Sequence, residues 1–499
     1  MPLDQVVPVP VHVEAREGEP FVLRDGMRVV VQDDPAAVSV ATLVAARIGR
    51  MGGFPVALVT HDDGADGAIV LRLVTDAAEL GVPTDLGAEL RSEAYRVDVT
   101  AGRVVLTAPS GAGLYRAATT LRQAVRREGG RYLLDPGVVL DHPRFAWRGL
   151  SLDVARHFFS VPQVRSVLDV MAGYKLNVLH LHLTDDQGWR LQLASRPELT
   201  ERSGRTAVGG DPGGFYTRED YAHLLAYAAA RHIAVVPEID VPGHINAALH
   251  ACAELTPSGE PAPAYTGIDV GFSRLHADLP GTEPFLREVF GELAAMTTGR
   301  YVHLGGDEVL SMAADEYAAL VRTAARHIAA AGKGVVGWQE VAGVLPDGAG
   351  QDVVVQYWDE REGAAEVAEA AARGARVLLS PATKVYLDMR YDADSPLGLD
   401  WAGHVEVRDS YDWEPLDVLP GVPAAQVVGI EAGLWTETVR TTEDLFWLLL
   451  PRLAAVAEVA WSPAARRDWA GFAPRLAAQH TLWDEAGLTW YRSPQVPWS

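Results

Sequence analysis

Eight short runs of apolar, often β-branched residues recur through the later part of the chain, and alanine-rich stretches of helical character separate most of them. Strands that alternate with helices in this way form parallel sheets. Eight such units are what a closed (β/α)8 barrel, or TIM barrel, requires. The rival is a doubly wound open sheet, but no glycine-rich dinucleotide fingerprint follows any of the runs. The predicted strands are 147–155, 176–184, 233–240, 301–307, 334–339, 353–358, 376–381 and 427–435.

The earlier part of the chain has a different pattern. Strands are predicted at 27–33, 68–74, 94–100 and 103–108, and Ala101-Gly102 is a hairpin signal between the last two. A helix is expected over 112–127, where apolar residues recur at helical spacing. We therefore expect an α/β protein with a small α+β domain at 1–142. A (β/α)8 barrel domain with a C-terminal helical segment is expected at 143–499.

The charge and composition of the chain argue against some classes of function. The formal net charge is −23 and no basic run occurs, which argues against nucleic acid or an anionic membrane as a partner. A neutral glycan is compatible with this charge. Cys252 is the one cysteine, so no internal disulfide is expected. No signal peptide is recognisable, which predicts a cytoplasmic protein, or a secreted one if a leader has been removed.

Chemically capable residues cluster at the ends of the predicted barrel strands. In a TIM barrel all carboxyl ends of the strands converge on one face, where catalysis takes place. Eight strand ends that supply acids, an arginine, a histidine and tryptophans therefore predict an active site. These residues are Asp153, Arg156, Asp185, Asp186, Glu238, Asp240, His244, Asp307, Glu308, Trp338, Trp358, Tyr386, Asp388, Trp435 and Glu437, with Trp401 in the seventh loop.

Several of these residues also have simpler interpretations. Asp185 lies in Asp-Asp-Gln-Gly, which is good turn chemistry by itself. Arg156 is either a structural ion-pair partner or a donor to sugar hydroxyls. A single tryptophan is usually a core residue, whereas several at a barrel mouth form flat walls suited to a pyranose ring.

His180 and His182 point to the same side of one predicted strand. This spacing resembles the His-x-His metal pair of barrel amidohydrolases and would indicate zinc. The pair lies inside the strand rather than at its end, and no matching histidine set follows. Buried, hydrogen-bonded histidines are the favoured interpretation, and no metal or other cofactor is predicted.

The adjacent carboxylates Asp307 and Glu308 are the most informative pair. A glycosidase that uses two carboxylates needs them about 5 Å apart when retaining and about 6.5–9.5 Å apart when inverting. Successive residues of an extended chain point to opposite faces, so this pair is poorly placed to flank one anomeric carbon. Glu308 could instead protonate the leaving oxygen while Asp307 orients an acetamide at C2 that attacks C1 itself. The simpler alternative is a helix N-terminal cap.

Seven motifs, in this order, resemble the β-N-acetylhexosaminidases of glycoside hydrolase family 20. They are DVARHFF, HLHLTDDQGWR, PEIDVPGH, HLGGDEV, VVGWQE, VQYW and LWTE. The small domain before the barrel and the ending YRSPQVPW are also typical of that family. The resemblance implies a retaining exo-glycosidase that removes terminal β-linked N-acetylglucosamine or N-acetylgalactosamine from glycans such as chitooligosaccharides. An oxazolinium intermediate is expected.

The resemblance also implies residue roles. Glu308 is expected to be the general acid/base, Asp307 to orient the acetamide, and Tyr386 to hydrogen-bond its carbonyl. The residues expected to bind or support the substrate are Arg156, Asp185, Asp240, His244, Trp338, Trp358, Asp388, Trp401, Trp435 and Glu437. A non-catalytic glycan-binding protein and a metal-dependent barrel hydrolase are the alternatives. A transglycosylase would share the same site and differ only in the acceptor.

Overall fold

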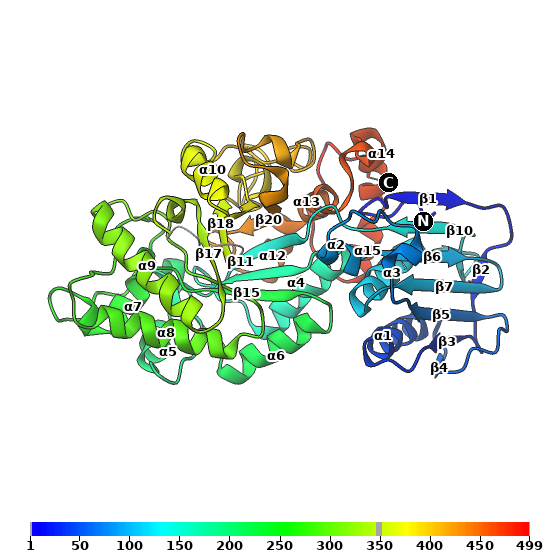
Figure 1. Ribbon diagram of the computed structural model, residues 1–499, viewed down its shortest axis with the longest axis horizontal. Coiled ribbons are helices and arrows are strands. Elements are labelled where there is room, and N and C mark those ends of the chain that lie inside the picture. The colour runs from blue at the N-terminus through cyan, green and yellow to red at the C-terminus, as the bar shows by residue number, and fades with distance from the viewer. Residues whose placement is uncertain (1, 346–351, 499) are drawn as a thin grey trace.

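The protein is described by a computed structural model that covers residues 2–345 and 352–498 (Figure 1). Eight parallel strands close into a barrel in chain order, which confirms the predicted TIM barrel. A small domain precedes it and lies at one end of the molecule. The barrel strands are β11 (Trp147–Asp153), β12 (Val178–His182), β15 (Ala234–Glu238), β16 (Tyr301–His303), β17 (Gly334–Trp338), β18 (Val353–Tyr357), β19 (Arg376–Leu379) and β20 (Val427–Leu434).

The barrel interior is filled by side chains in layers. An apolar layer lies near the amino ends of the strands and consists of Trp147, Val178, Val236, Tyr301, Val336, Val354, Leu378 and Val428. A polar layer lies above it, where Glu238 and Glu431 contact His180. The barrel is therefore a packed core rather than a pore, and its buried charge lies directly beneath the carboxyl ends of the strands.

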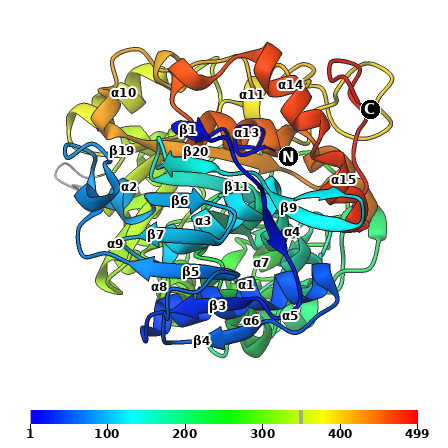
Figure 2. The ribbon, with the colours of Figure 1, turned by 90° about the vertical axis from the view of Figure 1, so that its right-hand side faces the viewer.

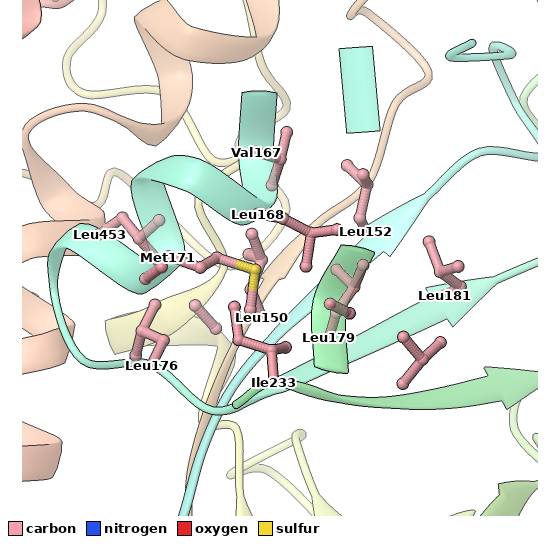
Figure 3. Close-up of a cluster of buried hydrophobic side chains, with 14 of the residues drawn as sticks. Leu150, Leu152, Val167, Leu168, Met171, Leu176, Leu179, Leu181, Ile233 and Leu453 are labelled. Carbon is pink, nitrogen blue, oxygen red and sulfur yellow. The ribbon is translucent and has the colours of Figure 1, made fainter. Parts of the chain in front are cut away.

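Amphipathic helices cover the outside of the barrel. Figure 3 shows how Leu168 and Met171 of α4 (Val161–Gly173) pack on Leu150 and Leu179 of the neighbouring strands. Within the described residues, the β17–β18 connection has only a 3-10 turn at Gln339–Gly343, and no helix is long and apolar enough to cross a membrane. The other helices of this part are α5 (Glu198–Ser203), α6 (Arg218–Ala229), α7 (Asn246–Ala251), α8 (Thr282–Met296), α9 (Ala314–Ala330), α10 (Ala364–Ala372), α11 (Ala382–Val385), α12 (Thr442–Leu449), α13 (Arg452–Trp461), α14 (Trp469–Ala477) and α15 (His480–Glu485).

The N-terminal domain is built on a mixed seven-stranded sheet in the order β1-β10-β6-β7-β5-β3-β4, which Figure 2 shows in front of the barrel. Its strands are β1 (His12–Ala15), β3 (Arg28–Val31), β4 (Ala57–Val59), β5 (Ala68–Leu73), β6 (Tyr95–Val99), β7 (Arg103–Ala108) and β10 (Gly137–Asp141). The predicted hairpin is confirmed, because β6 and β7 pair antiparallel around Ala101-Gly102. Strands β1, β4 and β10 were not predicted; β1 and β4 are short and lie at the two sheet edges.

Helices α1 (Pro35–Gly52) and α3 (Gly111–Ala124) pack on this sheet, and α2 (Ala88–Ser92) precedes β6. The predicted helix over 112–127 is wrong at its C-terminal end. Residues Arg126–Glu128 form strand β8, which pairs with β9 (Arg131–Leu134) in a second sheet with β2 (Phe21–Leu23). The helical periodicity continued past Ala124, but strand pairing determined the conformation of the next residues.

Buried charges fix the N-terminal domain to the barrel. Glu93 accepts hydrogen bonds from Arg116 at 2.8 Å and from Arg148, at the start of β11, at 2.6 Å. Lys175, just before β12, contacts Asp141 at 2.9 Å. These barrel residues lie at the amino ends of the strands. The domain therefore covers the face of the barrel opposite the predicted active site.

His232 is part of this interface and gives a prediction about stability. Its ring meets Tyr115 edge-on at 5.6 Å, and its carbonyl accepts a hydrogen bond from Arg116. Burial, and then the nearby Arg116, lower the pKa of His232 to about 4. An unfolded histidine has a pKa of about 6.5, so between these values only the unfolded chain is protonated. Stability contributed by neutral His232 is complete above roughly pH 6.5 and is lost as the pH falls toward 4.

We expect His232→Asn to lose less stability than wild type between pH 7 and pH 4.5 in urea unfolding. Asparagine is chosen because residue 232 has a φ of 54°, which asparagine tolerates better than most residues. His12→Asn on the exposed strand β1 is the matched control and should follow wild type. Parallel pH profiles for wild type and His232→Asn would contradict this assignment.

Candidate active site

The two adjacent carboxylates lie in the loop that follows β16. Gly305 has a φ of 76°, and a Cβ atom there would lie 1.7 Å from an Asp240 oxygen. Glu308 itself has a φ of 49°, so the assumption of an extended chain through the pair is wrong. The helix-cap alternative is also wrong, because α9 begins only at Ala314. This tight loop is therefore built to place the two carboxylates rather than to begin a helix.

His244 connects the two carboxylates to the barrel core. Its Nε2 atom lies 3.3 Å from Glu308 Oε2 and 3.8 Å from Asp307 Oδ2. Its Nδ1 atom lies 3.2 Å from Asp185 Oδ1. Burial alone would lower the pKa of His244, but the Asp185 carboxylate, followed by Asp307, raises it well above the usual imidazole value. A protonated imidazole at this position holds both carboxylates on one side of the site.

Asp240 holds the loop that carries Asp307. Asp240 is almost fully buried, and its Oδ1 accepts the Gly306 amide at 3.0 Å. Burial and the charge of Asp307 raise the pKa of Asp240 well above its ordinary value. The pKa of Asp307 is also raised, by burial and by Glu308, although His244 opposes this. Burial therefore disfavours the ionised form of both carboxyl groups, and more strongly for Asp240, which is the more deeply buried of the two.

Arg156 follows β11, and the first of its two predicted roles, a structural ion pair, is present. Its Nη2 atom pairs with Asp185 at 2.9 Å, which is the structural ion pair. Its Nε atom lies 4.0 Å from Glu437, and the buried Nε and Nη1 atoms have no hydrogen-bond partner among the described residues. Unpaired buried donors are costly, so this edge of the guanidinium is suited to a ligand's oxygen atoms.

Five aromatic side chains, from the ends of β17, β18 and β20 and from the β19–β20 connection, form one connected wall. Trp338 and Trp435 lie 5.8 Å apart, Trp358 stacks on Tyr386 at 6.2 Å, and Trp401 meets both Trp358 and Tyr386 edge-on. Trp338, Trp358 and Tyr386 are buried, whereas Trp401 is 41% exposed and lies at the rim. The wall gives the site flat apolar surfaces with N–H and O–H groups at their edges.

Asp388 and Glu437 lie on the same side of the site, after β19 and β20. Asp388 is buried, and burial followed by the charge of Glu437 raises its pKa well above the ordinary carboxyl value. The pKa of Glu437 is raised by burial, against the effect of Arg156. Acceptors beside the free edge of Arg156 form a polar corner suited to hydroxyl groups.

His180 and His182 are hydrogen-bonded within the barrel, as the favoured interpretation predicted. His180 contacts Glu431 at 2.9 Å and Glu238 at 3.1 Å, and His182 contacts Asp185 at 2.8 Å and also Glu238. Asp185 ends the short strand β13 (Thr184–Asp185) and pairs with Gly188 of β14 (Gly188–Trp189), so the predicted turn is present and its two central residues are Asp186 and Gln187. Both nitrogens of each histidine face carboxylates, which is the hydrogen-bonded arrangement that was favoured over a zinc site.

Two residues of the site had no predicted role: Glu238, which was named only as a residue at a strand end, and Glu340, which was not named. Glu238 ends β15 and receives contacts from Trp338 at 2.8 Å and His303 at 3.0 Å in addition to the two histidines. Glu340 follows β17 and accepts from Trp358 at 3.3 Å. Burial, and then Asp307, raise the pKa of Glu340 to about 8. The position at a strand end is the signal that could have found Glu340 as well, since it comes two residues after Trp338.

A TIM barrel that carries an acid pair, a polar corner and an aromatic wall at the carboxyl ends of its strands belongs to the class of barrel glycoside hydrolases. The glycosyl hydrolase family 20 catalytic-domain model matches residues 145–464, and the model of that family's domain 2 matches residues 4–142. The chain belongs to glycosyl hydrolase family 20. This confirms the resemblance that the seven motifs indicated.

Individual relatives agree with this assignment. The chain is 53% identical to a β-N-acetylhexosaminidase of Cellulomonas fimi, over 100% of this chain and 98% of the relative. Its structure resembles the family 20 β-N-acetylhexosaminidase of Streptomyces coelicolor A3(2), with a TM-score of 0.93 and 44% identity over 100% and 99% of the two chains. A mutant Streptomyces plicatus β-hexosaminidase in complex with product (GlcNAc) also has a TM-score of 0.93, at 44% identity over 100% and 98% of the chains.

Proposed function

We propose that the protein is a retaining exo-β-N-acetylhexosaminidase in which the substrate's own acetamide is the nucleophile. Asp307 orients that acetamide, and the adjacent Glu308 is the general acid and base. The observation that carries this proposal is the shared contact of both carboxylates with His244 Nε2. Two carboxylates held on one side cannot act from opposite faces of an anomeric carbon, so a protein nucleophile of the usual kind is not provided by this pair.

Glu308 is the general acid and then the general base. Its side chain is 32% exposed, which leaves it accessible to a departing group and to water. In the first step Glu308 gives its proton to the glycosidic oxygen as the bond from that oxygen to C1 breaks. In the second step the Glu308 carboxylate takes a proton from water, and the hydroxyl oxygen bonds to C1 as the bond between C1 and the acetamide oxygen breaks and the neutral acetamide is restored. Glu308 is therefore protonated again after one turnover.

Asp307 and Tyr386 act on the acetamide. The acetamide oxygen forms a bond to C1 as the leaving group departs, which gives a cyclic oxazolinium cation. Asp307 Oδ1 is buried and has no hydrogen-bond partner among the described residues, so it is suited to accept the acetamide N–H and to stabilise that positive charge. The Tyr386 hydroxyl is suited to donate to the acetamide oxygen. Trp338, Trp358 and Trp435 enclose the acetamide and the sugar ring.

The remaining residues bind the terminal sugar. Arg156 and Glu437 are suited to the ring hydroxyls and Asp388 to the 6-hydroxyl, while Asp185 and His244 orient Glu308. Trp401 at the rim lines the pocket entrance. A small-molecule carbohydrate is the substrate class, and we propose N-acetylhexosamine-terminated glycans and chitooligosaccharides within it. The similarity to the N,N'-diacetylchitobiase of Vibrio harveyi, 28% identical over 78% of this chain, supports this choice.

The stereochemical outcome tests this proposal. We expect NMR spectra recorded during chitobiose hydrolysis to show the β-anomer of N-acetylglucosamine first from the non-reducing residue, with the α-anomer appearing only by mutarotation. Retention follows because the acetamide and then water displace at C1 in two successive inversions. Initial formation of the α-anomer would contradict the proposal. Release of no sugar would favour the glycan-binding alternative.

A further inference from the structure

A groove between the N-terminal domain and the barrel lies away from the catalytic face. It has a volume of about 960 Å³ and is lined by α1 and α3 on one side and by the C-terminal part of α4, Arg231 after α6 and α15 on the other. The ends of α4 and α6 lead into the amino ends of β12 and β15. The groove is therefore on the side of the barrel opposite Glu308.

The groove is basic in a protein whose formal net charge is −23. Two acids line it, Asp169 and Glu485. The basic residues that line it are Arg47, Arg50, Arg122, Arg126, Arg127, Arg231 and His480. A local excess of arginine on an acidic protein attracts anions, because the field near the groove has the opposite sign to the net charge of the whole molecule.

Some of these arginines pair with protein acids, whereas Arg47 and Arg122 do not. Arg231 pairs with Asp169 at 2.6 Å, and Arg126 pairs with Asp135 at 2.9 Å. By contrast, Arg47 and Arg122 form no hydrogen bond or ion pair with any residue in the described ranges 2–345 and 352–498. Both are half-buried. Half-buried guanidinium groups without a partner are unusual because each offers five donors.

Arg47 and Arg122 both line a smaller pocket of about 30 Å³ between α1 and α3, together with apolar residues such as Leu121 and Val125. Burial, and then the like charge of Arg122, lower the pKa of Arg47 to about 10. The two guanidinium groups therefore repel each other, and Asp169, the acid that partly offsets this charge from a distance, is itself paired with Arg231. An anion bound between Arg47 and Arg122 would remove the repulsion.

We propose that the groove is a binding site for a dianionic phosphate- or sulfate-type group, held between Arg47 and Arg122. The planar fork of arginine matches two oxygens of a tetrahedral oxyanion, and charge-assisted hydrogen bonds of this kind are the strong ones. The volume is in the upper range for small-molecule pockets, so the groove has room for a free oxyanion or for one carried on a larger molecule such as a sugar phosphate. Tyr115, Tyr132 and Tyr227 also line the groove and offer hydroxyl donors and flat faces to that larger molecule.

The test is calorimetric titration of the full-length protein with inorganic phosphate and, separately, with glucose 6-phosphate at constant ionic strength. We expect saturable binding that Arg47→Gln and Arg122→Gln each weaken by about 10- to 100-fold, the loss expected for one charged hydrogen-bonding partner. Arg72→Gln is the matched control, because Arg72 is exposed on β5 and does not line the groove. Tighter binding of the sugar phosphate identifies an ester as the ligand, and equal binding identifies the free anion; both support an oxyanion site.

Thermal unfolding separates binding from a structural role. In phosphate-free buffer Arg47→Gln should unfold at the same temperature as wild type or a higher one, because the variant removes repulsion between uncompensated charges. Phosphate should raise the Tm of wild type and of Arg72→Gln but not that of the two groove variants. The proposal is overturned if all four proteins bind phosphate equally or none binds it saturably. It is also overturned if the groove variants change only the association of the chain with itself in sedimentation.

Discussion

Replacing Glu308 with glutamine should lower kcat/KM for p-nitrophenyl β-N-acetylglucosaminide by about 10²- to 10⁴-fold, the range for loss of a general acid–base group. Glutamine has nearly the same shape but can neither give up a proton to the leaving oxygen nor take one from water. His244 would keep its contact with Asp185, so the geometry of the site should persist. Initial-rate kinetics at the pH optimum measure the effect.

The defect should depend on the leaving group, because a more acidic phenol needs less protonation as it departs. The first step of Glu308→Gln should therefore recover with 2,4-dinitrophenolate as leaving group, while the water step stays slow. Glu366→Gln, on an exposed position of α10, is the charge-matched control and should retain wild-type rates. If the rate of the first step fell by the same factor for all leaving groups, Glu308 would not be the general acid.

Replacing Asp307 with asparagine should lower kcat by about 10²- to 10³-fold, the cost of removing one group that stabilises transition-state charge. The positive charge on the oxazolinium ion would then face a neutral amide. The asparagine amide can also turn its NH2 group toward the acetamide N–H, where no hydrogen bond can form. Kinetics with the acetamido substrate measure this loss.

The same variant should fold at least as stably as wild type at neutral pH. The pKa of Asp307 is raised by burial and by Glu308, so its ionised form is disfavoured in the folded state. Asparagine removes a charge that costs stability wherever the pH exceeds that raised pKa. A lower kcat together with an unchanged or higher Tm therefore separates a chemical role from a structural one. A rate near that of wild type would exclude Asp307 from the mechanism.

The barrel and most of the site could be predicted from the sequence because both follow local rules. Each barrel strand is an apolar run that is buried on both faces, and the chemistry-bearing residues follow directly at its end, as Trp338 follows Gly337 and Trp435 follows Leu434. Once eight such runs form a barrel, closure alone brings their ends together. Residues as distant in the sequence as Arg156 and Glu437 then lie 4.0 Å apart between Nε and Oε1.

Other features depend on tertiary contacts that no local pattern contains. The left-handed conformation at Glu308 arises in a loop where Gly305 packs against Asp240 and His244 reaches both carboxylates. The short strand β8 forms only because β9 pairs with it, which is why the helix prediction extended past Ala124. The buried network around Glu238 is likewise assembled from four separate strands, so its partners could not be assigned from spacing.

The most direct test of the central claim compares p-nitrophenol release from the β-N-acetylglucosaminide and from the plain β-glucoside, which differ only in the group at C2. The account predicts rapid cleavage of the first and no cleavage of the second above background, because without the acetamide no nucleophile is available at C1. Cleavage of both at similar rates would show that the protein supplies a nucleophile of its own, and would contradict the role assigned to Asp307 beside Glu308.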